Sequence, residues 1–298
     1  MASKAQIEET ARVLREGGLV AFPTETVYGL GANALDVKAV RKIFKAKGRP
    51  LSSPLIVHVT GVAMAKKLAA EWPAKAEKLA RKFWPGPLTI VVPKKAVVPD
   101  LVTAGFPSVG LRMPAHPVAQ RLLRASGVPL AAPSANRFRA VSPTTAAHVA
   151  KAFPGLMVLD GGPCAVGIES TVVSFAGPQP KILRPGMVTR TQIEKVIGRV
   201  EEGQGGESPG QHARHYSPKT RIVIGQAPKK GNGVRLELGP DPADAAENLY
   251  ATLHSLDGIG YEWIAVEMPP DTAEWAGVRD RLNRAASGGR PGKPQKST

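Results

Sequence analysis

Hydroxyl, glycine and cationic residues recur beside short apolar runs in the first two-thirds of the sequence. The segment "FPTETVYGLGAN", residues 22–33, continues the apolar run "GGLVAFP" with two threonines, a glutamate and two glycines. Similar residues flank the later apolar runs: Lys47, Arg49, Arg112, Ser134, Asn136, Ser142, Ser170, Thr171 and Arg184. Guanidinium groups, hydroxyls and glycine amides together suit a polyphosphate and a small zwitterion. The residue types therefore predict an anion-binding pocket built at strand ends.

The net charge is confined to the same part of the chain. The formal charge of the sequence is +16. Residues 1–198 contain 27 Lys and Arg against 11 Asp and Glu, whereas residues 199–298 contain 13 of each sign. A basic domain joined to a neutral one indicates that the basic domain binds an anionic ligand. Composition alone does not decide whether that ligand is a phosphate compound, a nucleic acid or both.

Composition and spacing exclude several classes of site. The single cysteine, Cys164, rules out a disulfide framework and a Cys-rich metal site. No His/Cys/Asp/Glu cluster has metal-ligand spacing, and neither a Ser-His-Asp set nor a Walker-type P-loop occurs. The first residues lack the apolar core of a signal peptide, and no apolar stretch is long enough to span a bilayer. We expect a soluble cytoplasmic protein.

Alternating strands and helices must position these residues, which predicts an α/β fold. Asp36 and Gly48 are the expected start and stop signals of one helix. Apolar runs predict strands at 18–23, 54–59, 88–93, 109–114, 129–134, 156–162, 170–175, 181–186, 220–225 and 261–269. Amphipathic patterns predict helices at 5–16, 36–48, 61–84 (in two pieces broken at Pro73), 117–126, 144–153, 242–256 and 272–286.

Composition also divides the chain. We predict a main domain over residues 1–198, a linker over 199–219 that is rich in glycine, proline and charge, a small α/β domain over 220–286, and a disordered tail over 287–298.

Taken in order, the segments resemble the YrdC-like family of L-threonylcarbamoyladenylate synthases over about residues 5–198. The segments that carry the resemblance are "PTETVYGLG", "KIFKAKGRP", "PLIVHV", "FWPGPLTIVV", "VGLRMPAHP", "APSAN", "SPTT", "GIESTVV" and "ILRPG". The linker "SPGQHARHYSP" and the ending "WAGVRDRLNRAA" resemble the longer, two-domain members. The resemblance implies a YrdC-like twisted open mixed sheet with flanking helices and a basic cleft, plus a small Rossmann-like C-terminal domain.

The resemblance also implies a reaction and its partners. L-threonine, bicarbonate or CO2, and ATP would give L-threonylcarbamoyl-AMP and pyrophosphate, which is a nucleotidyltransferase reaction. Mg2+ would be bound mainly through the ATP phosphates, which leaves no conspicuous ligand motif. The product would pass to a separate transferase for the N6-threonylcarbamoyladenosine modification of tRNA, and tRNA contact through the basic domain is expected as a secondary property.

Site residues are carried over from the resemblance by position. Lys47 and Arg49 would be catalytic and hold ATP phosphates, Arg112 would take the threonine carboxylate, and residues 24–31 would form the pocket floor. The linker would fold over the cleft. The nucleotide site would also contain Ser53, Ser108, Ser134, Asn136, Ser142, Arg184, His215 and Tyr216. The threonine site would contain Thr26, His58, Arg112, Ala132 and Ser170.

Each residue has a structural alternative. A histidine inside an apolar strand, such as His58, is more often a core residue than a ligand, and His215 in a linker would ordinarily face solvent.

Two features depart from the family pattern. Ser53 stands where many relatives have Asn or Asp, which shortens the reach of its hydrogen bonds. The region "RIVIGQAPKKGNGVRLEL" is shorter than the corresponding region of the two-domain members, so a regulatory or lid-anchoring role of the C-terminal domain does not follow from the resemblance.

Two other functions are open to a basic α/β chain of this kind. One is an RNA-binding module without synthase activity, which the +16 charge favours but the 5% aromatic content does not. The other is carbamoyl transfer from carbamoyl phosphate, as in hydrogenase-maturation proteins with a related domain. Those proteins carry zinc-binding and acylphosphatase-like modules, for which this chain has neither cysteines nor length.

Overall fold

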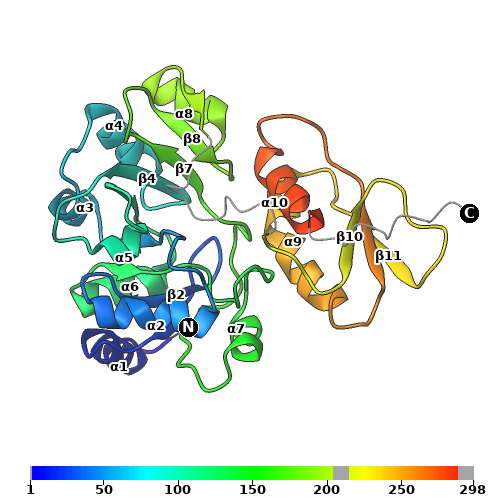
Figure 1. Cartoon of the computed structure of the whole chain (residues 1–298), viewed down its shortest axis with the longest axis horizontal. Coiled ribbons are helices and arrows are strands. Elements are labelled where there is room, and N and C mark those ends of the chain that lie inside the picture. The colour runs from blue at the N-terminus through cyan, green and yellow to red at the C-terminus, as the bar shows by residue number, and fades with distance from the viewer. Residues whose placement is uncertain (1, 204–214, 288–298) are drawn as a thin grey trace, which may run out of the picture.

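Two sheets organise the chain, and the computed structural model describes residues 2–203 and 215–287. A nine-stranded sheet belongs to the larger, N-terminal unit and a three-stranded sheet to the smaller, C-terminal unit (Figure 1). Within the described ranges no helix is long and apolar enough to cross a membrane.

The large sheet is mixed. Its strands are, in spatial order, β1 (Val20–Phe22), β2 (Gly29–Asn33), β6 (Leu130–Ala131), β3 (Ile56–His58), β5 (Ser108–Arg112), β4 (Leu88–Pro93), β7 (Thr171–Ser174), β8 (Lys181–Arg184) and β9 (Glu201–Glu202). The pairs β3–β5, β4–β7 and β8–β9 are parallel and the other neighbours are antiparallel. The predicted α/β fold with a mixed sheet and flanking helices is confirmed.

Helices cover both faces of this sheet. They are α1 (Lys4–Arg15), α2 (Val37–Lys47), α3 (Val62–Leu68), α4 (Ala74–Phe83), α5 (Asp100–Thr103), α6 (Pro117–Ser126), α7 (Ala146–Ala152) and α8 (Arg190–Ile197). Residues of α1 and α6 pack with Val20 and Phe22 in one apolar cluster, whereas residues of α2, α4 and α8 pack with Ala21 in another. Because Val20 and Phe22 alternate with Ala21 along β1, the two clusters lie on opposite faces.

Local signals explain where α2 begins and ends. The Asp36 side chain accepts hydrogen bonds from the amides of Lys38 and Ala39, as an N-cap does. Gly48 ends the helix with φ of 64°, a left-handed conformation that favours glycine. The chain then turns directly into Arg49, so the predicted start and stop signals are confirmed and fix where this arginine follows the helix.

One predicted strand was wrong, and four elements of the large unit were not predicted: β2, α5, α8 and β9. Residues 156–162 were predicted as a strand but form only a single bridge, between Val158 and Ala21, because the next residues turn around Asp160, which accepts from the Gly162 amide. Residues 29–33 were not among the predicted strands but form β2, which pairs antiparallel with β1. The stretch "PTETVY" is therefore the buried connection between two paired strands.

The C-terminal unit is small and its sheet is parallel. It consists of β10 (Arg221–Ile224), β11 (Gly233–Leu236), α9 (Pro242–Leu256), β12 (Trp263–Val266) and α10 (Ala276–Ala286), with the strand order β10-β12-β11. Both helices lie between this sheet and the large unit (Figure 1). Their apolar cluster includes Val27, Val141 and Ile168 of the large unit, so the two units share one core.

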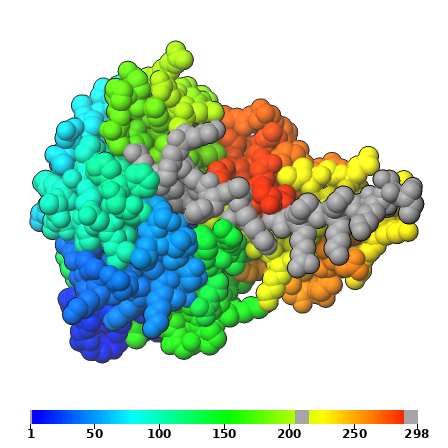
Figure 2. Space-filling view, in the orientation of Figure 1, coloured from blue at the N-terminus to red at the C-terminus, as the bar shows by residue number. Residues whose placement is uncertain are grey.

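Glycines lie at points where the two units approach closely. A Cβ placed on Gly277 of α10 would lie 2.9 Å from Ile168 Cδ1 and 3.0 Å from the Cα of Gly186, which are closer than ordinary contacts. In the space-filling view the red and orange surface of the C-terminal unit meets the green surface of the large unit (Figure 2). Absence of side chains at both positions thus allows backbone-to-backbone packing.

The domain boundaries stay predictions. The strand β9 falls inside the predicted linker, 199–219, and pairs with β8 of the large sheet. The remainder of that linker includes residues 204–214, and the predicted tail includes residues 288–298, both of which lie outside the described residues.

Candidate active site

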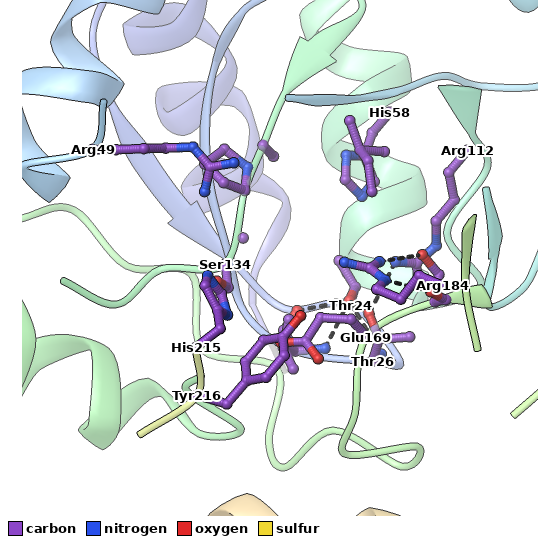
Figure 3. Close-up of a pocket in the computed structure, with 16 residues that line it drawn as sticks. Thr24, Thr26, Arg49, His58, Arg112, Ser134, Glu169, Arg184, His215 and Tyr216 are labelled. Carbon is purple, nitrogen blue, oxygen red and sulfur yellow. Dashed lines mark hydrogen bonds between the residues drawn. The ribbon is translucent and has the colours of Figure 1, made fainter. Parts of the chain in front are cut away.

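A pocket lies where the large sheet meets the residues that lead into the C-terminal unit, and its lining comes from distant parts of the chain (Figure 3). It is lined by Thr24, Thr26, Val27, Gly29, Arg49, Ile56, His58, Arg112, Ala132, Pro133, Ser134, Glu169, Ser170, Arg184, His215 and Tyr216. Ten residues predicted for the site from the sequence are among them: Thr26, Arg49, His58, Arg112, Ala132, Ser134, Ser170, Arg184, His215 and Tyr216.

The connection between β1 and β2 forms one wall. Thr24 Oγ1 lies 2.8 Å from Thr26 Oγ1 and donates to the carbonyl of Val27 at 2.7 Å. The amides of Thr26 and Val27 in turn donate to Thr24 Oγ1. This local network fixes the loop without a sheet ladder, and it leads into Gly29, whose added Cβ would lie 3.3 Å from that of Ala132.

His58 and Arg112 stand together at the carboxyl ends of parallel strands. They are register partners of β3 and β5. The Arg112 guanidinium donates to Thr26 Oγ1 at 2.9 Å and lies 2.7 Å from the Glu25 carboxylate. Burial, aided by the positive charge of Arg112, lowers the pKa of His58 to about 3. His58 is therefore neutral, and its Nδ1 has no hydrogen-bond partner among the described residues.

Arg49 and Arg184 bring two further positive charges to the pocket. Arg49 donates to the carbonyl of Pro54 at 3.0 Å, and burial lowers its pKa to about 10, which leaves it charged at neutral pH. Arg184 donates to the carbonyl and the hydroxyl of Ser170 at 3.0 and 3.2 Å. Burial lowers the pKa of Arg184 as well. With Arg112, the pocket has three guanidinium groups.

Lys47 does not line the pocket. Its ammonium group is buried and donates to the carbonyls of Ser134 and Asn136, and burial lowers its pKa. Asn136 also lies behind the lining, where its amide donates to the carbonyls of Arg137 and Ala140. In this structure both residues order the loop that presents Ser134.

Three predicted serines are buried outside the lining. Ser142 Oγ donates to Glu169 at 2.6 Å, so it acts behind that carboxylate. Ser108 begins β5 and therefore lies at the opposite end of the strand from Arg112. The Ser53 amide donates to the carbonyl of Pro50, within the turn after Arg49. The predicted ligand roles of these serines stay predictions.

Glu169 is the charged lining residue that sequence reasoning missed. Its Oε1 accepts from Ser142, and its Oε2 accepts from Tyr250 at 3.0 Å and from Arg281 at 2.8 Å. Burial would raise the pKa of Glu169, but the charges of Arg281 and Arg184 outweigh it and lower the pKa to about 2. The signal available in the sequence was an acid directly before Ser170 in a basic domain. The apolar lining residues Ile56 and Pro133 were also missed, whereas Thr24, Val27 and Gly29 fall within the predicted pocket floor, 24–31.

His215 and Tyr216 are buried, although a linker histidine was expected to face solvent. The His215 amide donates to the carbonyl of Arg284 on α10, and Ser217 Oγ donates to that of Ala285. Burial, with the nearby charges of Arg49 and Lys47, lowers the pKa of His215 to about 3. His215 and Tyr216 therefore line the pocket on the side of the C-terminal unit, opposite His58 (Figure 3).

The arrangement favours binding of anions over metal ligation by side chains. Three arginines line a pocket with one carboxylate, and that carboxylate already accepts hydrogen bonds from protein donors. Among the residues that the structure describes, no group of three or more His, Cys, Asp or Glu side chains could hold a metal ion.

Known proteins match the chain over both units. Residues 12–186 match the family model of Sua5, YciO and YrdC proteins, described as telomere recombination, and residues 188–287 match the C-terminal domain of threonylcarbamoyl-AMP synthase. The threonylcarbamoyl-AMP synthase of Pyrococcus abyssi is 41% identical, over 94% of each chain. That of Bacillus subtilis is also 41% identical, over 95% of this chain and 93% of its own. A crystal structure of P. abyssi Sua5 complexed with L-threonine has a TM-score of 0.91 at 39% identity, over 96% of this chain and 95% of that one.

Proposed function

The chain belongs to the family of threonylcarbamoyl-AMP synthases, and from this premise we propose that it makes L-threonylcarbamoyl-AMP and pyrophosphate from L-threonine, bicarbonate or CO2, and ATP. This places it among the nucleotidyltransferases. The observation that carries the proposal is the pocket itself, because it combines cations for a polyphosphate with the neutral His58 and charged Arg112 suited to an amino acid.

In this proposal L-threonine is bound by His58, Arg112 and Thr26. Arg112 would pair with the threonine carboxylate, which the forked guanidinium suits. The neutral His58 presents an acceptor nitrogen that can receive a hydrogen bond from the amino group. A neutral amine forms a nitrogen–carbon bond to CO2 as one C=O π bond breaks, and it gives up one proton to water; the resulting carbamate oxygen then attacks the α-phosphorus of ATP.

The nucleotide end falls to Arg49, Arg184 and Ser134. The carbamate oxygen forms a bond to the α-phosphorus as the bond to the pyrophosphate oxygen breaks, and the electron pair leaves with pyrophosphate. Negative charge therefore builds on the phosphoryl oxygens and the leaving group, where the fixed cations Arg49 and Arg184 would stabilise it. Alignment of the two substrates supplies a further part of the acceleration. This route uses no protein nucleophile.

Mg2+ would enter with ATP. The lining offers cations and hydroxyls, and the Glu169 oxygens are held by Ser142, Tyr250 and Arg281, so the donor set suits an ion held mainly by phosphate oxygens. When bound, the ion would neutralise part of the phosphate charge. The residues named above bind and orient the substrates around it.

Two partners complete the proposal. The product is a reactive mixed anhydride that would pass to a separate transferase for the N6-threonylcarbamoyladenosine modification of tRNA. The positive charge of residues 1–198 supports an accompanying tRNA contact. An RNA-binding role without synthase activity is not favoured, because it leaves the buried His58 and Arg112 without a use.

Release of pyrophosphate tests the proposal. Purified protein with ATP, bicarbonate and Mg2+ should release pyrophosphate only when L-threonine is present. The Arg49→Ala variant should lose this release, whereas Arg41→Ala, which removes an exposed arginine of α2, should keep it. Folded wild-type protein that releases no pyrophosphate with threonine would overturn the synthase assignment.

A further inference from the structure

We propose that Arg281, on the last helix, is a positioning residue of the nucleotide site, because it holds the Glu169 carboxylate so that the charge of Arg184 acts on the substrate rather than on Glu169. The inference rests on the proposed function, since it assigns Arg184 to an anionic substrate. In this inference the C-terminal unit contributes to substrate binding in the pocket of the large unit.

Arg281 binds Glu169 at more than one point. Its Nε donates to Glu169 Oε2 at 2.8 Å, and its Nη2 donates to the Glu169 backbone carbonyl at 3.0 Å. Its Nη1 donates to the carbonyl of Pro185, the residue directly after Arg184, at 2.9 Å. The Arg281 side chain is 0% exposed. One guanidinium thus ties together the two backbone segments that carry Glu169 and Arg184.

The C-terminal unit contributes a second donor to the same carboxylate. Tyr250 of α9 donates to Glu169 Oε2 at 3.0 Å, while Ser142 of the large unit donates to Oε1. Together with Arg281, these donors bind both oxygens of Glu169. The carboxylate is therefore turned toward α9 and α10, although its residue lines the pocket.

Charge explains why this matters for the pocket. The positive charges that stabilise the ionised Glu169 carboxylate most are those of Arg281, first, and Arg184, second. If Arg281 is removed, the buried Glu169 carboxylate still requires a positively charged partner. Arg184 is then the strongest positive charge that remains near it. Glu169 would then compete with substrate phosphates for Arg184 and would also repel them.

A purely structural role is the alternative that an experiment must separate. The Arg281 guanidinium also lies over the ring of Tyr216, at 5.3 Å, so its loss could loosen the closing segment in general. Competition by Glu169 makes a distinct prediction: removing the carboxylate as well should relieve the defect. General loosening predicts no such relief.

The test is a double-mutant cycle with the full chain. KM values for ATP and for L-threonine, and kcat, would be measured for wild type, Arg281→Met, Glu169→Gln and the double variant. We expect Arg281→Met to raise the KM for ATP by about tenfold, the effect of roughly one weakened charged contact. The KM for L-threonine should change much less, and the double variant should recover most of the ATP affinity.

Controls and a second readout keep the test decisive. Arg279→Met removes an arginine of the same helix whose partners, Asp271 and Pro269, belong to the C-terminal unit, so it should leave both KM values unchanged. Arg281→Lys should fall between wild type and Arg281→Met. Binding of ATP alone, by calorimetry, should follow the same pattern and does not need turnover. The proposal is overturned if the double variant binds ATP no better than Arg281→Met, or if both KM values rise equally.

Failure of this inference can be distinguished from failure of the proposed function. Wild-type protein that binds ATP but releases no threonine-dependent pyrophosphate would contradict the synthase assignment, and the calorimetric cycle would still decide the role of Arg281. If Arg281→Met does not fold, Tyr250→Phe supplies the second variant. It removes one donor to Glu169 and should raise the dissociation constant for ATP in the same direction.

Discussion

The imidazole rings of His148 and His254 stack between α7 and α9, with ring centroids 3.9 Å apart and planes 20° apart. His254 Nε2 lies 3.1 Å from the carbonyl of Ser142, and the Thr144 amide donates to His148 Nδ1. The pair therefore joins the large unit to the C-terminal one beside the residue that holds Glu169. Two stacked rings cannot both take up a proton without repulsion.

The first prediction concerns acid stability. Burial, with the neighbouring His254, lowers the pKa of His148 to about 4, and burial lowers that of His254. As the pH falls below about 6.5 the unfolded chain binds protons that the folded chain refuses, so the free energy of unfolding should fall between about pH 6.5 and 4. In His254→Phe, which keeps a ring, this fall should be shallower. Urea unfolding from pH 8 to 5 measures both slopes, and equal slopes would contradict the prediction.

The second prediction concerns Lys47. Replacing it with Met would leave the carbonyls of Ser134 and Asn136 without their buried donor. Each such loss costs about 1–3 kcal/mol, so the free energy of unfolding should fall measurably in urea. The exposed Lys45→Met on the same helix is the control. A fall in activity with the free energy of unfolding unchanged would contradict this prediction and would instead support the role that the resemblance implies, in which Lys47 holds ATP phosphates.

The third prediction concerns His58. His58→Phe keeps an aromatic ring against Phe22 but removes the acceptor nitrogen. The KM for L-threonine should rise by about tenfold, which corresponds to one hydrogen bond, while the KM for ATP should change little. Steady-state kinetics with each substrate varied in turn measures this. A rise confined to the KM for ATP would show that His58 serves the other substrate.

The fourth prediction concerns Gly277. Its replacement by Ala forces α10 away from Ile168 and Gly186, because the added carbon would lie within about 3.0 Å of both. We expect a loss of about 1–3 kcal/mol in the free energy of unfolding. The KM for ATP should also rise, since α10 carries Arg281. Gly258→Ala, whose added carbon would come no closer than 3.6 Å to its neighbours, should do neither.

Elements with strong local signals could be predicted from the sequence. The bounds of α6 and α9 were predicted correctly, because each begins with a proline after a capping residue, His116 or Asp241. The strand β2 was missed because its pairing with β1 depends on tertiary contacts that alternation of apolar residues does not encode.

The candidate site was predictable in its cations but not in its carboxylate. Arg112 and Arg184 end strands, so their convergence at one pocket could be expected, and the family resemblance placed Arg49, which follows helix α2, with them. The environment of Glu169 could not, because its partner Arg281 lies 112 residues further along the chain. The burial of His215 was missed for the same reason, since the carbonyl that its amide binds belongs to Arg284.

The distance along the chain between Glu169 and Arg281 also has a consequence for synthesis. A ribosome makes the chain from its N-terminus, so the large sheet and the pocket wall with Glu169 emerge first. Arg281 lies in the last helix and must leave the exit tunnel before it can reach them. A nascent chain from which α10 has not yet emerged therefore has Glu169 beside Arg184 and Ser142 but without Arg281. Completion of the C-terminal helix thus acts as the last step in assembly of the nucleotide site.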